Sequence, residues 1–115
     1  MGAVKCIVAI VERGRADKII AKTKKVGAKG ATVLYGRGTG ETEVARFLNI
    51  HIESSKEIII ILTEEDKYKV IYDTIIEVGK LKQPGTGIIF TVPISNLVGL
   101  YHRKEFEKGN KDNLQ

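Results

Sequence analysis

The segment Glu57–Leu62 contains four consecutive isoleucines and constrains the fold of this chain more than any other feature. A short β-branched run is typical of a strand, and its lack of alternation indicates that both faces are covered. Val4–Val11 is a second run of this kind, and the apolar segments Ala31–Tyr35 and Gly87–Ile94 predict two further strands. Pro93 indicates an edge position or the end of the last strand.

Two segments with helical periodicity separate these strands. Ala16–Val26 places apolar residues on one face and lysines on the opposite face, and Gly27 is a typical helix terminator. The second helix is predicted to have Thr63 as its N-cap, acidic residues in its first turn and Gly79 at its end. Its predicted apolar stripe consists of Val70, Ile71, Thr74, Ile75 and Val78.

The order of these elements is β-α-β-β-α-β, which predicts an α+β fold of the ferredoxin-like sandwich type. Two helices would cover one face of a four-stranded antiparallel sheet. A solvated second face should alternate apolar and polar residues, but Cys6–Val11 and Ile58–Leu62 do not. We therefore expect a large apolar patch there and an obligate homo-oligomer built on it. The alternative is that the irregular segment Glu41–Ser55 folds over this face.

Length and composition exclude several classes of protein. A chain of 115 residues is expected to form one domain, and its single cysteine excludes an internal disulfide and a cysteine-based zinc site. Positive charge is concentrated in residues 1–30 and 67–115 and the middle is acidic, so no basic stripe for nucleic acid is predicted. No targeting or membrane-spanning segment is apparent, and a cytoplasmic location is expected.

Two glycine-rich segments are candidates for anion binding. Gly36-Arg37-Gly38-Thr39-Gly40 is predicted to be a flexible loop and Gly85-Thr86-Gly87 a turn. Neither has the spacing of a dinucleotide fingerprint or a P-loop. Backbone N–H groups beside the Arg37 guanidinium would suit an anion, and a Cβ at Gly87 is expected to obstruct a phosphate. A plain turn is the alternative at each place.

Candidate catalytic groups are few. Cys6 lies inside a predicted core strand and is expected to be a buried, inert thiol. His51 with Glu53 could act in acid–base chemistry, and His102 with Arg103 could contact a phosphate, but solvated surface explains both pairs. No arrangement of Ser, His and Asp suggests nucleophilic catalysis.

Three segments, at residues 27–38, Lys56–Ile60 and Pro84–Phe90, resemble the PII nitrogen-regulatory signal-transduction proteins, in particular their divergent PII-like branch. Residues 27–38, which read Gly-Ala-Lys-Gly-Ala-Thr-Val-Leu-Tyr-Gly-Arg-Gly, resemble the second-strand signature of that family. Lys56–Ile60 resembles the strand that leaves its long T-loop, and Pro84–Phe90 resembles its B-loop and the following strand. The resemblance extends over residues 4–101 and implies a homotrimer.

The resemblance implies that an adenine nucleotide (ATP, ADP or AMP) binds in clefts between subunits, with the need for Mg²⁺ left open. Thr32 would hydrogen-bond the adenine, while the backbone of Gly36–Thr39 and the loop Gly85–Gly87 would hold the phosphates. The nucleotide-binding residues predicted in this way are Thr32, Gly36, Arg37, Gly38, Thr39, Gly85, Thr86, Gly87 and Arg103.

The resemblance also implies a non-enzymatic sensor, in which nucleotide binding controls a target protein through the T-loop. By analogy, the target is a membrane transporter or a metabolic enzyme. The family domain would span residues 1–103 with a T-loop-like excursion at 37–55, and residues 104–115 would form a flexible polar tail. The predicted target-binding residues are Glu41, Glu43, Arg46, Phe47 and Leu48.

The chain departs from the family where cations usually hold phosphates. Ile88 stands where a lysine usually follows the B-loop, and Gly99 and Tyr101 stand where two arginines often lie. We therefore expect weaker selectivity for triphosphates, with His102 and Arg103 as candidates to compensate.

Two other function classes are compatible with the predicted fold. One is a trimeric metal- or small-anion-binding protein; for a metal, the two histidines and one cysteine supply few ligands. A small acylphosphatase-type enzyme would need an arginine in the loop after the first strand, for which Arg13 or Arg15 qualifies. It would also need an asparagine on a nearby strand, and no predicted strand contains one.

Overall fold

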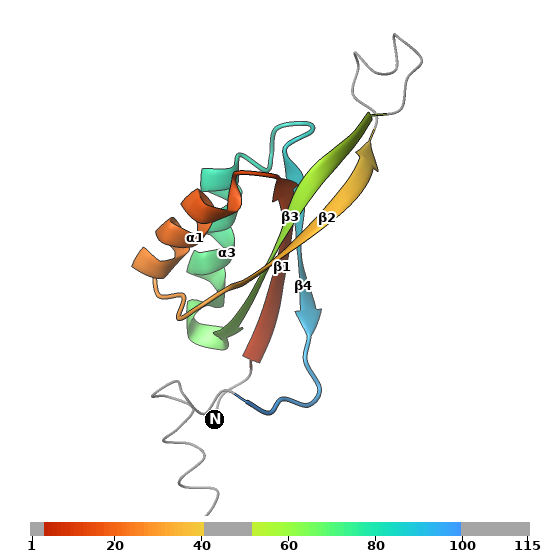
Figure 1. Ribbon diagram of the computed structural model, residues 1–115. Coiled ribbons are helices and arrows are strands. Elements are labelled where there is room, and N and C mark those ends of the chain that lie inside the picture. Colours follow the sequence, from red (N-terminus) through yellow and green to blue (C-terminus); the bar gives the residue numbers. More distant parts are fainter. Residues whose placement is uncertain (1–3, 41–51, 100–115) are drawn as a thin grey trace, which may run out of the picture.

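The computed structural model describes residues 4–40 and 52–99 of the chain. Figure 1 shows two helices packed against one side of a four-stranded sheet in this part of the chain. The strand order is β2-β3-β1-β4, and all three neighbouring pairs are antiparallel. The predicted ferredoxin-like arrangement is therefore confirmed. The elements are β1 (Val4–Glu12), α1 (Ala16–Lys25), β2 (Thr32–Gly40), β3 (Ile52–Glu64), α3 (Glu65–Gly79) and β4 (Gly87–Pro93).

The hydrophobic core lies between the sheet and the two helices. Successive side chains of a strand point to opposite faces, so the odd-numbered residues of β1 and β3 share the face beneath the helices. The fully buried large side chains of this core are Ile7, Val11, Ile19, Thr23, Ile59, Ile61, Ile71 and Ile75. The isoleucine run thus fills both faces of the central strand β3, as expected from its lack of alternation.

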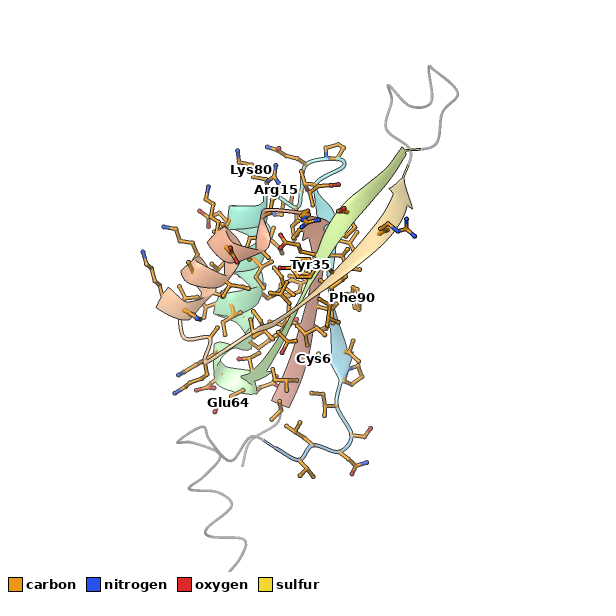
Figure 2. The ribbon with its side chains drawn as sticks, viewed as in Figure 1. Cys6, Arg15, Tyr35, Glu64, Lys80 and Phe90 are labelled. Carbon is orange, nitrogen blue, oxygen red and sulfur yellow. The ribbon has the colours of Figure 1, made fainter. Side chains whose placement is uncertain are left out.

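The face of the sheet away from the helices is also apolar. Val8 pairs with Ile60 on one side and Phe90 on the other, so their side chains form one row across β3, β1 and β4. Figure 2 shows Phe90 on the side of the sheet opposite the helices. We call this surface the open face; it consists of Cys6, Val8, Ile10, Leu34, Ile58, Ile60, Leu62, Ile88, Phe90 and Val92.

The beginning of α1 is held by a side chain from β3. Arg15 occupies the N-cap position without a capping side-chain hydrogen bond of its own. Instead, Glu57 Oε1 accepts hydrogen bonds from the N–H groups of Gly14, at 2.6 Å, and Ala16, at 3.1 Å. Glu57 is only 6% exposed, so its carboxylate is a buried acceptor at the positive end of the helix dipole. This contact fixes the turn between β1 and α1 against the central strand.

The beginning of α3 differs from the prediction. Thr63 is a buried residue of β3, and its hydroxyl donates to the carbonyl oxygen of Glu64 rather than capping the helix. Glu64 is the N-cap and makes no capping side-chain bond. The acidic first turn is present as expected, with Glu65 and Asp66.

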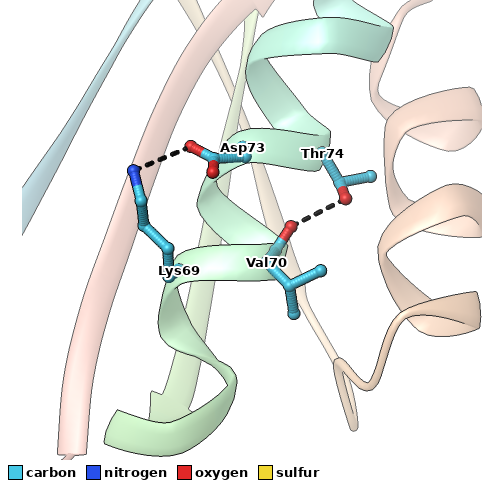
Figure 3. Close-up of polar contacts among 4 residues, drawn as sticks. All are labelled: Lys69, Val70, Asp73 and Thr74. Carbon is cyan, nitrogen blue, oxygen red and sulfur yellow. Dashed lines mark hydrogen bonds and ion pairs between the residues drawn. The ribbon is translucent and has the colours of Figure 1, made fainter.

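The buried face of α3 is rotated from the predicted stripe. Ile71, Ile75 and Gly79 are buried, whereas Val70 is 46% exposed. Figure 3 shows the outer surface, where the Thr74 hydroxyl donates to the Val70 carbonyl oxygen at 2.7 Å and Lys69 pairs with Asp73 at 3.3 Å. Val78 packs against the core as predicted, and so do Tyr68 and Tyr72, which the predicted stripe did not include.

Candidate functional site

The glycine-rich segment of β2 is a strand and not the predicted flexible loop. Gly36 pairs with Lys56 and Gly38 pairs with Ser54. A Cβ on Gly36 would lie 3.2 Å from Ile58 Cδ1, and a Cβ on Gly38 would lie 3.3 Å from Lys56 Cε. The two glycines therefore leave room for side chains of β3 to lie across β2. Pairing with β3 overrides the low strand propensity of glycine.

Beyond the end of β1, β2 and β3 continue as a two-stranded arm. β1 ends at Glu12, opposite Lys56, so within the described strands residues 37–40 and 52–55 pair with each other alone. Figure 1 shows this β2–β3 arm projecting beyond the sheet. The predicted excursion at 37–55 is thus β-structure at both ends. The predicted target-binding residues Glu41, Glu43, Arg46, Phe47 and Leu48 lie outside the described residues.

The turn between α3 and β4 is closed by the side chain of Thr86. Its hydroxyl lies 2.8 Å from the Lys80 carbonyl oxygen and 2.9 Å from that of Gln83, so it can donate to either. Gly85 has a φ of 78°, and no atom lies within 4 Å of where its Cβ would be. The Thr86 hydroxyl thus shapes this turn, and the donors that it could offer to an anion are backbone N–H groups.

Gly87 is required by the sheet itself. Its φ is 148°, and an added Cβ would lie 2.4 Å from the Ile10 carbonyl oxygen and 3.3 Å from Val11 Cα. Gly87→Ala would therefore push β4 away from β1, whether or not a phosphate approaches. Because Gly87→Ala would disturb the sheet, a loss of phosphate binding in this variant would not show that Gly87 contacts the phosphate. Gly85 is the better position for such a test.

The two glycine segments lie at opposite edges of one sheet. Tyr35 pairs with Glu57, whose partner Val11 pairs with Gly87, so all four residues lie in one row across the sheet. Three strand spacings of about 4.8 Å separate β2 from β4, or about 14 Å in all. A single chain therefore does not bring the predicted phosphate-binding segments together.

A shallow hollow of about 370 Å³ lies at the root of the β2–β3 arm. Its lining combines cationic side chains with one tyrosine and a strand glycine: Arg13, Tyr35, Gly36, Arg37, Ser55 and Lys56. The Arg13 guanidinium lies 5.7 Å from the centroid of the Tyr35 ring, and Tyr35 is 72% exposed. Lys56 pairs with Glu12 on the neighbouring strand. We call these six residues the arm hollow.

Of these residues, the sequence predicted only Gly36 and Arg37 for the nucleotide site. Arg13 could have been assigned to the site from the sequence, because it directly follows the first strand. Nothing in the sequence could assign Tyr35, Ser55 and Lys56 to it, since their proximity depends on the register between β2 and β3. The structure thus joins the first glycine segment to the turn after β1, and not to the turn before β4.

Of the other residues predicted for the nucleotide site, some lie within the described part of the chain and one does not. Thr32 begins β2, is exposed, and pairs with Ile60 at the margin of the open face. Thr39 is described through its backbone in β2, and Arg103 lies outside the described residues. A larger hollow of about 540 Å³ lies at the end of α3, with side chains of both charges, and contains none of the predicted residues.

Cys6 is less buried than expected. It lies on the open face between Leu62 and Val92 and retains partial exposure. Burial raises the pKa of the Cys6 thiol, so the protonated form is favoured at neutral pH. Within residues 4–40 and 52–99, no three His, Cys, Asp or Glu side chains are grouped in a way that could hold a metal ion. In the same part of the chain, no helix is long and apolar enough to span a membrane.

Residues 4–104 match the sequence profile of the family described as nitrogen regulatory protein P-II. The chain belongs to this family. A search of curated proteins found no match.

Two solved P-II-type structures share the fold. The GlnK–ATP complex of B. subtilis superposes with a TM-score of 0.69 at 22% identity, over 87% of this chain and 91% of that one. The Arabidopsis thaliana PII protein bound to citrate superposes with a TM-score of 0.65 at 23% identity, over 86% of this chain and 84% of that one. The match to the family profile confirms the resemblance, and these two structures confirm the fold.

Proposed function

We propose that this P-II protein binds an adenine nucleotide between two copies of itself and controls a target protein through the β2–β3 arm. The observation that carries the proposal is the position of Gly36–Gly38 and Gly85–Gly87 at opposite edges of one sheet. Two backbone segments suited to phosphate can act on one ligand only if β2 of one copy meets β4 of another. The GlnK relative, whose structure contains ATP, supports the choice of nucleotide.

The open face supplies the reason for association. Leu34, Ile88, Phe90 and Val92 are each at least 41% exposed in the single chain. Together with the partly buried residues beside them, they form a continuous apolar surface of the kind that marks an interface. A contact between unlike edges is heterologous, and a heterologous contact gives a closed assembly when its rotation completes a ring. We propose that the ring contains three copies, as the family resemblance implies.

The arm connects the proposed nucleotide site to the proposed target site. Gly36–Thr39 is the predicted phosphate-binding backbone and lies in β2, which ends at Gly40, and the predicted target-binding residues begin at the next position in the sequence. A ligand that contacts the root of the arm would therefore bias its conformations, and a target that prefers one of them would respond. We propose this coupling as the signalling step, and we propose no enzymatic reaction.

Isothermal titration of ATP, ADP, AMP and cyclic AMP into the purified protein tests the nucleotide role. We expect saturable binding close to one site per chain. The absence of heat and of thermal stabilisation with all four ligands would refute this role.

Subunit mixing tests the location of the site. Arg37→Glu alters the β2 side, and Gly85→Asp alters the turn before β4 in open space, so each variant alone should bind ATP poorly. After the two are unfolded together and refolded as mixed oligomers, about one quarter of the clefts should combine two intact sides and recover binding. No recovery from the mixture, while the wild type binds ATP, would place the site within one chain.

A further inference from the structure

The arm hollow brings three cationic side chains together, and one of them, Arg13, has no carboxylate partner among the described residues. Arg13, Arg37 and Lys56 all line a space of about 370 Å³. Lys56 is paired with Glu12, but among the described residues the Arg13 guanidinium has no carboxylate partner and rests on the Tyr35 ring. Cations that converge on one hollow repel each other, so an anion bound between them would lower the free energy of the arrangement.

Arg13 is held in position by its surroundings. Its backbone N–H donates to the Ser55 carbonyl oxygen at 3.1 Å, which ties the turn after β1 to the arm. The next residue of that turn, Gly14, is fixed by the buried Glu57 carboxylate. The Tyr35 ring, 5.7 Å from the guanidinium, supports it through a cation–π contact. A guanidinium restrained in this way loses less conformational entropy when it binds an oxyanion.

The other proposed side of the nucleotide site contributes little charge next to its glycine turn. Ile88, directly after Gly87, is apolar, 57% exposed and part of the open face. The turn itself offers backbone N–H groups but no cationic side chain between Pro84 and Gly87. The two lysines earlier in this turn, Lys80 and Lys82, line the separate hollow at the end of α3. Cations next to the predicted phosphate-binding backbone are found in the arm hollow, which includes Gly36 and Arg37 of the predicted site.

We propose that Arg13 is a phosphate-binding residue of this protein and that, with Arg37 and Lys56, it receives the terminal phosphates of the bound nucleotide. This inference rests on the proposed nucleotide function and names the residues that give it charge. The hollow is near the lower limit of ligand-site volumes, which suits the phosphate end of a nucleotide better than the whole molecule. Because Arg13 also contacts Ser55 through its backbone, an occupied hollow would connect the ligand to the arm.

Arg13→Gln tests the assignment, with Arg15→Gln as the matched control. Both residues are exposed arginines of the same turn, but Arg15 does not line the hollow. A guanidinium–phosphate contact predicts that Arg13→Gln weakens ATP binding about tenfold or more. Binding of adenosine should change less than about twofold, because adenosine carries no phosphate. Arg15→Gln should leave both affinities within about twofold, and Arg13→Lys should recover part of the ATP affinity.

Each other outcome is decisive. An equal loss of ATP and adenosine affinity in Arg13→Gln would show that Arg13 acts through the fold, and unchanged ATP affinity would show that it binds no phosphate; both overturn the proposal. If the wild type binds no nucleotide, the proposed function fails, and titration with inorganic pyrophosphate decides about the hollow. Pyrophosphate binding that Arg13→Gln weakens would establish a polyanion site without a nucleotide, and no pyrophosphate binding would overturn the assignment.

Discussion

Replacing Glu57 should destabilise the protein more than any other single change of an acidic side chain among the described residues. Glu57→Ala removes the acceptor for two backbone N–H groups at the beginning of α1. The Ala16 N–H is buried, so its lost bond costs about 1–3 kcal/mol, whereas the Gly14 N–H lies in an exposed turn and can partly turn to water. The loss of a helix cap costs about 0.5–2 kcal/mol by itself. We expect the free energy of unfolding to fall by about 2–3 kcal/mol.

Urea denaturation at one fixed protein concentration measures this change, because the stability of an oligomer depends on concentration. Glu57→Gln keeps a carbonyl oxygen as acceptor and loses only the charge at the helix N-terminus, so it should cost about 1 kcal/mol. Glu65→Gln is the control: Glu65 is exposed in the first turn of α3 and lies 3.7 Å from Lys5, a pair worth less than about 0.5 kcal/mol. If Glu57→Ala costs no more than this control, the buried carboxylate does not hold α1.

Two further predictions concern the open face. Phe90→Asp should reduce the mass measured by light scattering at micromolar concentration to that of one chain, because an unpaired carboxylate is costly to bury in an interface. Thr91→Asp on the other face of β4 should leave the mass unchanged, and a monomeric wild type would contradict both expectations. Since burial raises the pKa of Cys6, the thiolate fraction at pH 8 is low and iodoacetamide should alkylate Cys6 more slowly than free cysteine. The rate should rise with pH and in Phe90→Asp, and a rate equal to that of free cysteine in the wild type would refute the burial of this thiol.

The layers of the fold could be predicted from the sequence because local pattern and tertiary structure agree there. The isoleucine run, the β-branched run of β1 and the lysine-lined face of α1 each indicate one element and one environment. Pro93 ends an edge strand, as predicted. The apolar character of both sheet faces could also be predicted, since apolar and polar residues do not alternate in strands that are covered on both sides.

Local pattern failed where distant residues decide the conformation. Gly36–Gly40 has the composition of a loop, yet it forms a strand because β3 supplies the hydrogen-bonding partner and side chains that lie over the glycines. Thr63 has the chemistry of an N-cap, yet it lies in the buried end of β3. The true acceptor at α1, Glu57, is 41 residues away in sequence from Ala16, the first residue of the helix. No short segment of the sequence could therefore predict this contact.

For the same reason, only part of the candidate site could be predicted from the sequence. Its backbone segments could be recognised from glycines and from the family resemblance, but its cations come together through strand register. Lys56 reaches the first glycine segment because it pairs with Gly36, and Arg13 reaches it because its N–H bonds to Ser55 of the arm. The same register places the second glycine segment at the far edge of the sheet. The proposed site therefore has its cations on one subunit and its glycine turn on the neighbouring subunit. Nucleotide binding would then report the assembly of the oligomer together with the position of the arm.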